Sequence, residues 1–180
     1  MNRRFAITLL AVLVGAVPAG RAADIVIDFE QADIGKPVPT WTDKGVVLNL
    51  AGPLIHSKAA GRIMFFPHLA TNHKGILNAM ATEQAIPVQA TFPIDASAVT
   101  LVLWGSTGCP ALLEALDKNG KVVDQASVAA APGRENPADP IPFFELTVKA
   151  PAIAAIRFSG PRDGEFLAAD EIRFTTVDAK

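Results

Sequence analysis

The stretch Val99–Val128 reads VTLVLWGSTGCPALLEALDKNGKVVDQASV, and its pattern predicts three strands separated by two turns. The first run, Val99–Trp104, is apolar and rich in β-branched and large side chains, and the glycines and proline of GSTGCP end it. The second run, Ala111–Asp117, contains good helix formers, but seven residues between a proline and a turn are short for a helix. The Asn-Gly pair that follows is a strong hairpin signal, so a strand is favoured here, with a return strand over Val122–Val128.

Short strand patterns recur along the rest of the chain. Asp24–Glu30 alternates, with Ile25, Ile27 and Phe29 on one face, which is typical of a half-buried strand. The least regular stretch is His68–Glu83, where a short helix around Ile76–Ala81 is one interpretation. Gly- and Pro-rich loops are expected over Gln31–Lys44 and Ala129–Pro142. The other expected strands are Gly45–Leu50, Arg62–Phe66, Pro87–Phe92, Phe143–Val148, Ala155–Gly160 and Phe166–Thr175.

This pattern of about nine or ten short strands, without a sustained amphipathic helix, predicts the fold class. We expect an all-β protein, an antiparallel two-sheet β-sandwich of the jelly-roll type, as one domain over residues 23–180. Its first and last strands, Asp24–Glu30 and Phe166–Thr175, should be neighbours. The side chains expected in the core are Leu101, Leu103, Leu112, Val122, Ile156, Phe158, Ile172 and Phe174.

Met1–Ala22 has the features of a secretory signal peptide. Arg3 and Arg4 precede a nearly unbroken apolar run over Phe5–Val17, and small residues follow up to Ala22. The alternative is an uncleaved anchor helix, for which the apolar run is short. We therefore expect cleavage near Ala23, export to the periplasm or the extracellular space, and no stable membrane insertion after cleavage.

Charge and cysteine content narrow the possible partners. Loss of the signal segment removes three arginines and leaves 13 basic against 18 acidic residues, a net charge of −5. A mildly acidic domain does not suggest nucleic acid or an anionic membrane as a partner. Cys109 is the only cysteine, so it forms no internal disulfide, and we interpret it as a half-buried, small apolar residue.

Sequence motifs for catalysis are missing. The chain has no Walker loop, no dinucleotide-binding glycine pattern, no Gly-x-Ser-x-Gly and no His-Glu-x-x-His. His56, His68 and His73 are the three histidines, but the spacing of five between the last two does not match ligands on a helix. A transition-metal site is therefore disfavoured, and no pair of carboxylates stands out for glycoside hydrolysis.

The order of strands resembles a known superfamily. The chain runs from DFE through GVVL, PVQATF, VTLVLWG, ALLEALDKNGKVV and IAAIRFSG to FLAADEIRF. This order, with the Asp-x-x-Gly turn inside Leu116–Val123 and the closing Asp-x-Ile-x-Phe of Asp170–Phe174, resembles the galactose-binding-like β-sandwich jelly rolls. That superfamily contains many carbohydrate-binding modules and small exported bacterial domains, and its fold hosts many functions.

The resemblance implies one structural Ca²⁺ where the first and last strands meet. The matching carboxylates here are Glu30 and Asp170, and Asp28 is a weaker candidate on the same face as Glu30. A carboxylate at the rim of an apolar face needs a counter-charge, and Ca²⁺ takes oxygen ligands. The alternative is that Asp170 caps a turn or pairs with Arg157 or Arg173.

Sugar binding usually needs an aromatic platform beside polar groups. The chain has two tryptophans and no tyrosine. Trp41, in a Pro-rich loop, is expected to be the exposed one, whereas Trp104 ends a strand that reads as buried. A ligand site is therefore predicted at Trp41 together with polar residues of the irregular stretch, namely His68, Asn72, His73 and Asn78.

Three functions are compatible with these patterns. The favoured one is an exported, non-catalytic binding module whose partner is a glycan. The alternative is a structural or protein-interaction domain that binds an envelope protein, for which a large exposed apolar patch would be evidence. The third is an enzyme of unrecognised type, which would need a pocket with convergent titratable groups.

Overall fold

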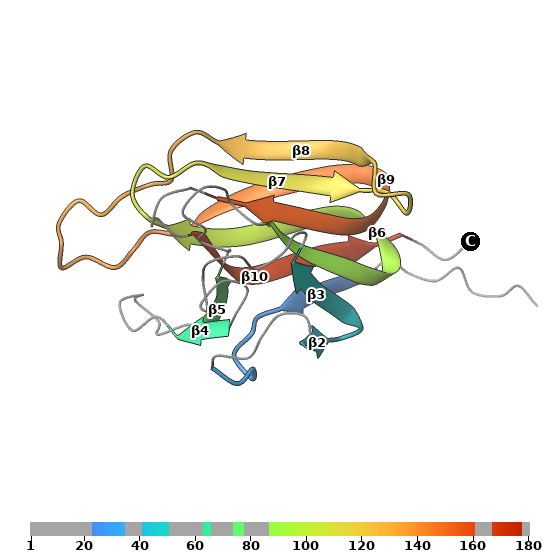
Figure 1. Cartoon of the computed structure of the whole chain (residues 1–180), viewed down its shortest axis with the longest axis horizontal. Helices are drawn as coiled ribbons and strands as arrows, with labels where there is room; N and C mark the ends of the chain where they lie inside the picture. Colours follow the sequence, from blue (N-terminus) through green and yellow to red (C-terminus); the bar gives the residue numbers. More distant parts are fainter. Residues whose placement is uncertain are drawn as a thin grey trace, which may run out of the picture.

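The computed structural model describes residues 23–34, 41–50, 63–65, 74–77, 87–160 and 167–177, and Figure 1 shows their arrangement. Within these ranges the secondary structure is entirely β, as predicted, and every strand pairing is antiparallel. The strands are β1 (Asp24–Ile27), β2 (Thr42–Asp43), β3 (Val46–Leu50), β4 (Ile63–Phe65), β5 (Lys74–Leu77), β6 (Val88–Gly105), β7 (Ala111–Leu116), β8 (Val122–Val128), β9 (Phe144–Ser159) and β10 (Leu167–Thr176).

Two long strands, β6 and β9, carry the chain from one layer of the sandwich to the other. Over 88–91, β6 pairs with β3 and with 155–158 of β9. Beyond two register shifts, the same strand pairs with β10 and with 144–149 of β9. The sequence predicted four separate strands in these regions, and Pro93 and Pro151 lie between them. Both prolines fall where the β6–β9 pairing is interrupted, so no ladder hydrogen bond requires their missing N–H groups.

The register divides the molecule into two layers. The layer that we call the β7 sheet contains β3, the first part of β6, the second part of β9, β7 and β8. The layer that we call the β10 sheet contains β4, β5, β1, β10, the second part of β6 and the first part of β9. β1 pairs with β10 from Asp24↔Thr175 to Ile27↔Ile172, which confirms that the first and last strands are neighbours.

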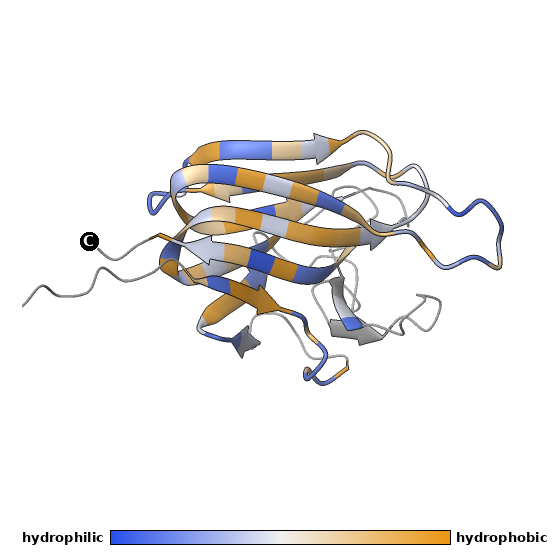
Figure 2. Cartoon of the chain, turned by 180° about the vertical axis from the view of Figure 1, so that it is seen from behind, coloured by the Kyte–Doolittle hydropathy of each residue, from blue (hydrophilic) through white to orange (hydrophobic). Residues whose placement is uncertain are grey.

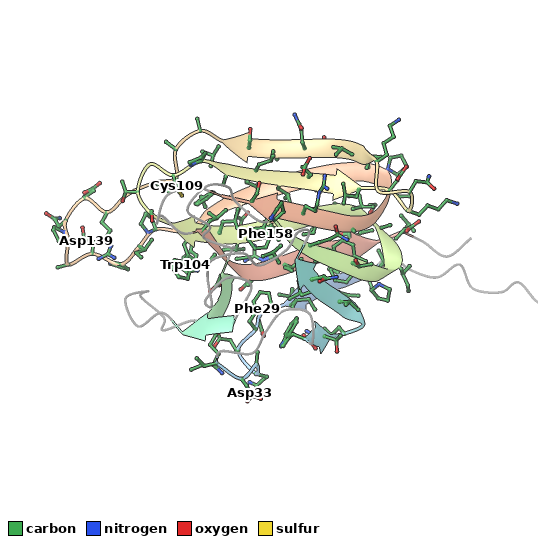
Figure 3. All side chains as sticks on the ribbon, viewed as in Figure 1. Phe29, Asp33, Trp104, Cys109, Asp139 and Phe158 are labelled. Carbon is green, nitrogen blue, oxygen red and sulfur yellow. The ribbon has the colours of Figure 1, made fainter. Side chains whose placement is uncertain are left out.

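One hydrophobic core lies between the two layers. Figure 2 shows apolar and polar residues alternating along the strands, and the apolar ones form a single buried cluster. Phe158 lies among the strands in Figure 3, is 1% exposed and belongs to this cluster. Trp104 is 0% exposed but lies outside the cluster, because its neighbour Leu103 points into the core. Phe92 of β6 packs on Phe174 of β10 with ring centroids 4.6 Å apart. Each fully buried side chain of this size contributes roughly 1.5–3 kcal/mol.

Six of the eight predicted core residues are buried, and two are not. Leu101, Leu103, Ile156, Phe158, Ile172 and Phe174 are at most 2% exposed. Ala111–Leu116 is a strand, as predicted, but its register puts Leu113 and Ala115 in the core. Leu112 is only half-buried, because neighbours on a strand point to opposite faces. Val122 is 38% exposed, since it lies on the edge strand β8 beside a bulge in the β7–β8 ladder.

The connections around Cys109 anchor the longest described loop. Figure 1 shows the β8–β9 connection projecting from the body, and Asp139 is labelled near its tip in Figure 3. Its base is held by backbone hydrogen bonds from Ala131 N to Cys109 O (2.7 Å) and from Gly108 N to Ala131 O (2.9 Å). Cys109 itself forms no disulfide, is 0% exposed and belongs to the core cluster, so it is fully buried and not half-buried as predicted. Among the described residues, no helix has the length and apolar character needed to cross a membrane.

Candidate functional site

A row of polar side chains crosses the outer face of the β7 sheet. Asn49 of β3 pairs with Gln89 of β6, which pairs with Arg157 of β9. Arg157 pairs in turn with Glu114 of β7, and Glu114 with Gln125 of β8. Each of the five is at least partly exposed, while its neighbours Val88, Phe158 and Leu113 point into the core. The row therefore presents amide, guanidinium and carboxylate groups to solvent along one line.

An ion pair lies at the centre of this row. Arg157 Nη2 is 3.1 Å from Glu114 Oε2, and the two side chains are 30% and 20% exposed. Arg157 Nε is buried and has no hydrogen-bond partner among the described residues. The partial burial of the pair protects it from full screening by salt. Its charges cancel, so the centre of the row carries no net charge.

A hollow of about 280 Å³ adjoins the row. Gln89, Thr91 and Arg157 supply its polar side. Its floor is apolar, because Leu116 and Ala155 there are only 3% and 7% exposed, and Ala154 also lines it. The β7–β8 turn forms the wall, with Asp117, Lys118 and Gly120. A mostly apolar floor with a few polar groups is the common composition of small-molecule sites.

The wall of the hollow is a well-ordered hairpin turn. Asp117 Oδ1 accepts hydrogen bonds from the backbone N–H groups of Asn119 (2.8 Å) and Lys121 (3.0 Å). The hydrogen bond from the Lys121 N–H is the main reason that the pKa of the Asp117 carboxyl lies below its usual value. Desolvation opposes this shift, and the N–H of Asn119 adds to it. Gly120 has φ +77°, as the Asn-Gly signal requires.

The outer face of the β10 sheet is also polar, but its charges are paired with one another. Arg173 Nη1 is 2.8 Å from Glu145 Oε1, and Arg173 Nε is 2.6 Å from Glu171 Oε2. The hydrogen bond to Glu171 is the main reason that the pKa of Arg173 is raised. Thr100 and Thr147 also share a hydrogen bond of 2.8 Å between their hydroxyl oxygens. The polar groups named here are therefore engaged with one another.

Trp41 is buried, and the expectation that it is the exposed tryptophan is wrong. It is 9% exposed and packs on Phe29 with ring centroids 5.1 Å apart, within the core cluster. Its remaining edge lines another hollow of about 280 Å³, with polar residues around it. The other lining residues are Asp28, Phe29, Gln31, Ala32, Thr42, Asp43 and Lys44. Trp104 is buried, as predicted.

The remaining predicted ligand residues cannot be placed. His68, Asn72, His73 and Asn78 lie outside the described residues, as does His56. Within the irregular stretch that contains them, Lys74–Leu77 forms strand β5, so the interpretation of a helix from Ile76 is wrong at its first two residues. Contact of Trp41 or of these residues with a ligand stays a prediction.

The residues predicted to hold Ca²⁺ lie around one junction of the β10 sheet. Glu30 follows β1, and Asp170 lies at a bulge of β10, where it is 3% exposed. Lys74 enters the same region: its backbone N–H donates to Glu30 Oε1 at 2.9 Å. Its Nζ donates to the carbonyl oxygens of Glu30 (2.7 Å) and Ala32 (2.9 Å). Asp28 Oδ1 instead accepts the backbone N–H of Glu30 at 3.2 Å.

These contacts do not fit a metal ion. The loop carbonyls that Ca²⁺ would need already accept hydrogen bonds from an ammonium group. No group of three or more His, Cys, Asp or Glu side chains suited to a metal was found among the described residues. Of the two arginines considered as partners of Asp170, Arg157 pairs with Glu114. The other, Arg173, pairs with Glu145 and Glu171.

The polar row could not be found by sequence reasoning. Each member occupies the solvent side of an alternating strand, a position at which a polar residue needs no explanation. Only the register across five strands aligns them. The one sequence signal near the hollow was the Asn-Gly turn, which was interpreted as a fold signal and not as part of a site.

Comparisons with known proteins support the fold. No family model and no curated protein matches the sequence. The K1 cleaved adhesin domain of Lys-gingipain from Porphyromonas gingivalis W83 superposes with a TM-score of 0.53 at 11% identity, covering 86% of this chain and 99% of that one. The K2 cleaved adhesin domain of Lys-gingipain gives 0.53 at 16% identity, covering 86% and 100%. TmCBM61, solved in complex with β-1,4-galactotriose, gives 0.46 at 11% identity, covering 74% and 90%. The two adhesin domains confirm the β-sandwich fold.

Proposed function

We propose that the protein is an exported, non-catalytic module that binds a neutral carbohydrate on the outer face of the β7 sheet. The observation that carries this proposal is the hollow beside the polar row, with its apolar floor of Leu116 and Ala155 and its polar side of Gln89, Thr91 and Arg157. A sugar ring has an apolar C–H face and a rim of hydroxyl groups. The hollow offers a counterpart to each of these features.

The chemistry of the row favours hydroxyl groups over charged ones. Gln89 can donate and accept at once, Thr91 can do the same, and Arg157 donates. Glu114 neutralises Arg157 at 3.1 Å, which removes the net attraction for a carboxylate or a sulfate. The volume of about 280 Å³ lies near the small end of ligand pockets, so it suits a single sugar ring within a longer glycan.

The export expected from Met1–Ala22 agrees with this function, because glycans are abundant outside the cytoplasm. A protein-interaction domain is the second candidate. The exposed large apolar side chains in the described regions include Val47, Val122 and Val123, at 38–43% exposure. Val122 and Val123 lie on the edge strand β8 of the same sheet, so a protein partner would cover this edge.

Binding to a glycan array, followed by calorimetry with the best neutral oligosaccharide, tests the proposal. Replacement of Gln89 or Thr91 by Ala should weaken binding about tenfold each, since each removes one or two hydrogen bonds. The matched control is Thr147→Ala on the outer face of the β10 sheet, which should leave the affinity unchanged.

Two results would contradict this assignment. If Thr91→Ala and Thr147→Ala weaken the affinity for a glycan equally, the binding site lies elsewhere. The second candidate would be established if the chain binds no glycan on the array and instead captures one envelope protein reproducibly. That capture should be lost when Val122 and Val123 are replaced.

A further inference from the structure

Two strands share one edge of β10, end to end. Near the start of β10, β5 pairs with Ala168 and Ala169. Farther along, β1 pairs with residues from Ile172 to Thr175. The bulge that contains Asp170 separates the two partners, and Asp170 is buried there at 3% exposure. The sheet edge therefore has a junction at which one strand partner replaces another, beside a buried carboxyl group.

Lys74 joins the two strands across this junction. Its backbone N–H donates to the Glu30 carboxylate, and its Nζ donates to the carbonyl oxygens of Glu30 and Ala32. These oxygens belong to a tight turn after β1, closed by a hydrogen bond of 2.9 Å from Ala32 N to Phe29 O. Phe29 has φ +59°, a left-handed conformation that is uncommon for a bulky residue, and its ring is 1% exposed. The turn thus aims two carbonyl oxygens at a single cationic group.

We propose that the Lys74 ammonium is the built-in cation of this junction and fills the position where a metal ion would otherwise be needed. Carbonyl oxygens that converge on one point repel each other unless a cation or a donor lies between them. An ammonium group supplies a full charge and three donors. Gly75 permits the placement, because a Cβ there would come within 2.9 Å of Ala169 O and push β5 away from β10. The junction is then independent of external calcium.

Thermal unfolding of the purified protein with EDTA and with added Ca²⁺ tests the proposal, using Lys74→Met, Lys74→Ala and the matched control Lys44→Met. Lys44 Nζ also donates to a backbone carbonyl, that of Val26, but it does so at an exposed site with one acceptor. The wild-type melting temperature should not respond to EDTA or to Ca²⁺. Lys74→Met should lower it by about 5 °C, and Lys44→Met should change it much less.

Lys74→Ala should gain a calcium response, because removal of the ammonium leaves the carbonyl oxygens of Glu30 and Ala32 without a cation. Saturating Ca²⁺ should raise the melting temperature of this variant by about 5–10 °C. Three results would overturn the proposal: a fall in the wild-type melting temperature with EDTA, equal stability of Lys74→Met and Lys44→Met, or no response of Lys74→Ala to Ca²⁺.

A measurement on the wild-type chain decides the matter if the variants do not fold. Acetylation of lysine amines, followed by mass spectrometry, should be about tenfold slower at Lys74 than at the exposed Lys118, because reaction requires both hydrogen bonds to break. Equal rates at the two lysines would show that the ammonium is not held at the junction, and would contradict the proposal.

Discussion

Two hollows in the described part of the chain are alike in size, but their lining residues make different contacts. Each measures about 280 Å³. In the first, the aromatic residue Trp41 packs on Phe29 and belongs to the core, and Lys44 and Asp28 already bond to backbone groups. In the second, on the β7 sheet, the polar groups of Gln89 and Thr91 line an apolar floor.

This difference shows why a prominent residue type is a weak guide to a site. Burial of an aromatic ring removes a large apolar area from water, so a tryptophan in a loop stabilises the fold whenever the loop folds back on the core. A row of ordinary amides and hydroxyls contributes little to the core and is available to a ligand. The following predictions test this division between a structural and a binding hollow.

The largest effect is expected at Trp41. Replacement by Ala should lower the free energy of unfolding by about 3–5 kcal/mol, because it leaves a cavity against Phe29. Denaturant unfolding measures this loss, and Trp41→Phe should recover part of it. Thr91→Ala in the other hollow should stay within about 0.5 kcal/mol of wild type. If Trp41→Ala keeps its stability and loses glycan binding, the first hollow is the ligand site and the comparison is reversed.

A second test concerns the register that creates the polar row. Leu113 is 0% exposed and Leu112 is half-buried, so Leu113→Ala should cost about 2–5 kcal/mol and Leu112→Ala less than half as much. The same register turns Glu114 outward to face Arg157. Equal costs at the two leucines, measured by denaturant unfolding, would mean that β7 is shifted by one residue and that the row does not exist.

The smallest effect is expected at the wall of the second hollow. The pKa of the Asp117 carboxyl lies below its ordinary value of 3.8 in the folded state, so the ionised form stabilises the turn. This contribution is complete above the ordinary pKa and is lost as the pH falls through the folded-state pKa. Carboxyl NMR titration should give a midpoint below 3.8 for Asp117. In Asp117→Asn, the deficit in stability seen near pH 6 should vanish in strong acid; a deficit independent of pH would assign the effect to geometry alone.

Alternation and turn chemistry predicted much of the fold. The strand over Ala111–Leu116, the Asn-Gly hairpin and the β1–β10 pairing are all confirmed. The long strands β6 and β9 were predicted as four shorter ones, because a proline ends a strand pattern unless the ladder is interrupted at that residue. Whether the ladder is interrupted there depends on the neighbouring strands, which a local pattern does not contain.

The candidate site was predicted less well. Trp41 was selected because aromatic residues in loops bind sugars, but its burial depends on how the loop packs against Phe29. A Ca²⁺ site at Glu30 and Asp170 stays a prediction, and Lys74, which bonds to Glu30, comes from the stretch that was hardest to interpret. Neither contact is local in the sequence, so no spacing rule reports it.

By itself, the sequence determined the all-β class, the turns and the inward face of most strands, because these follow from side chains within a few residues of one another. The tertiary structure alone decided which strands pair, and in which register. The polar row joins residues from position 49 to position 157, and the Lys74 junction joins residues 42 to 44 apart. Such contacts arise only when the two layers close on one core, since only that packing selects one register among many with similar local patterns.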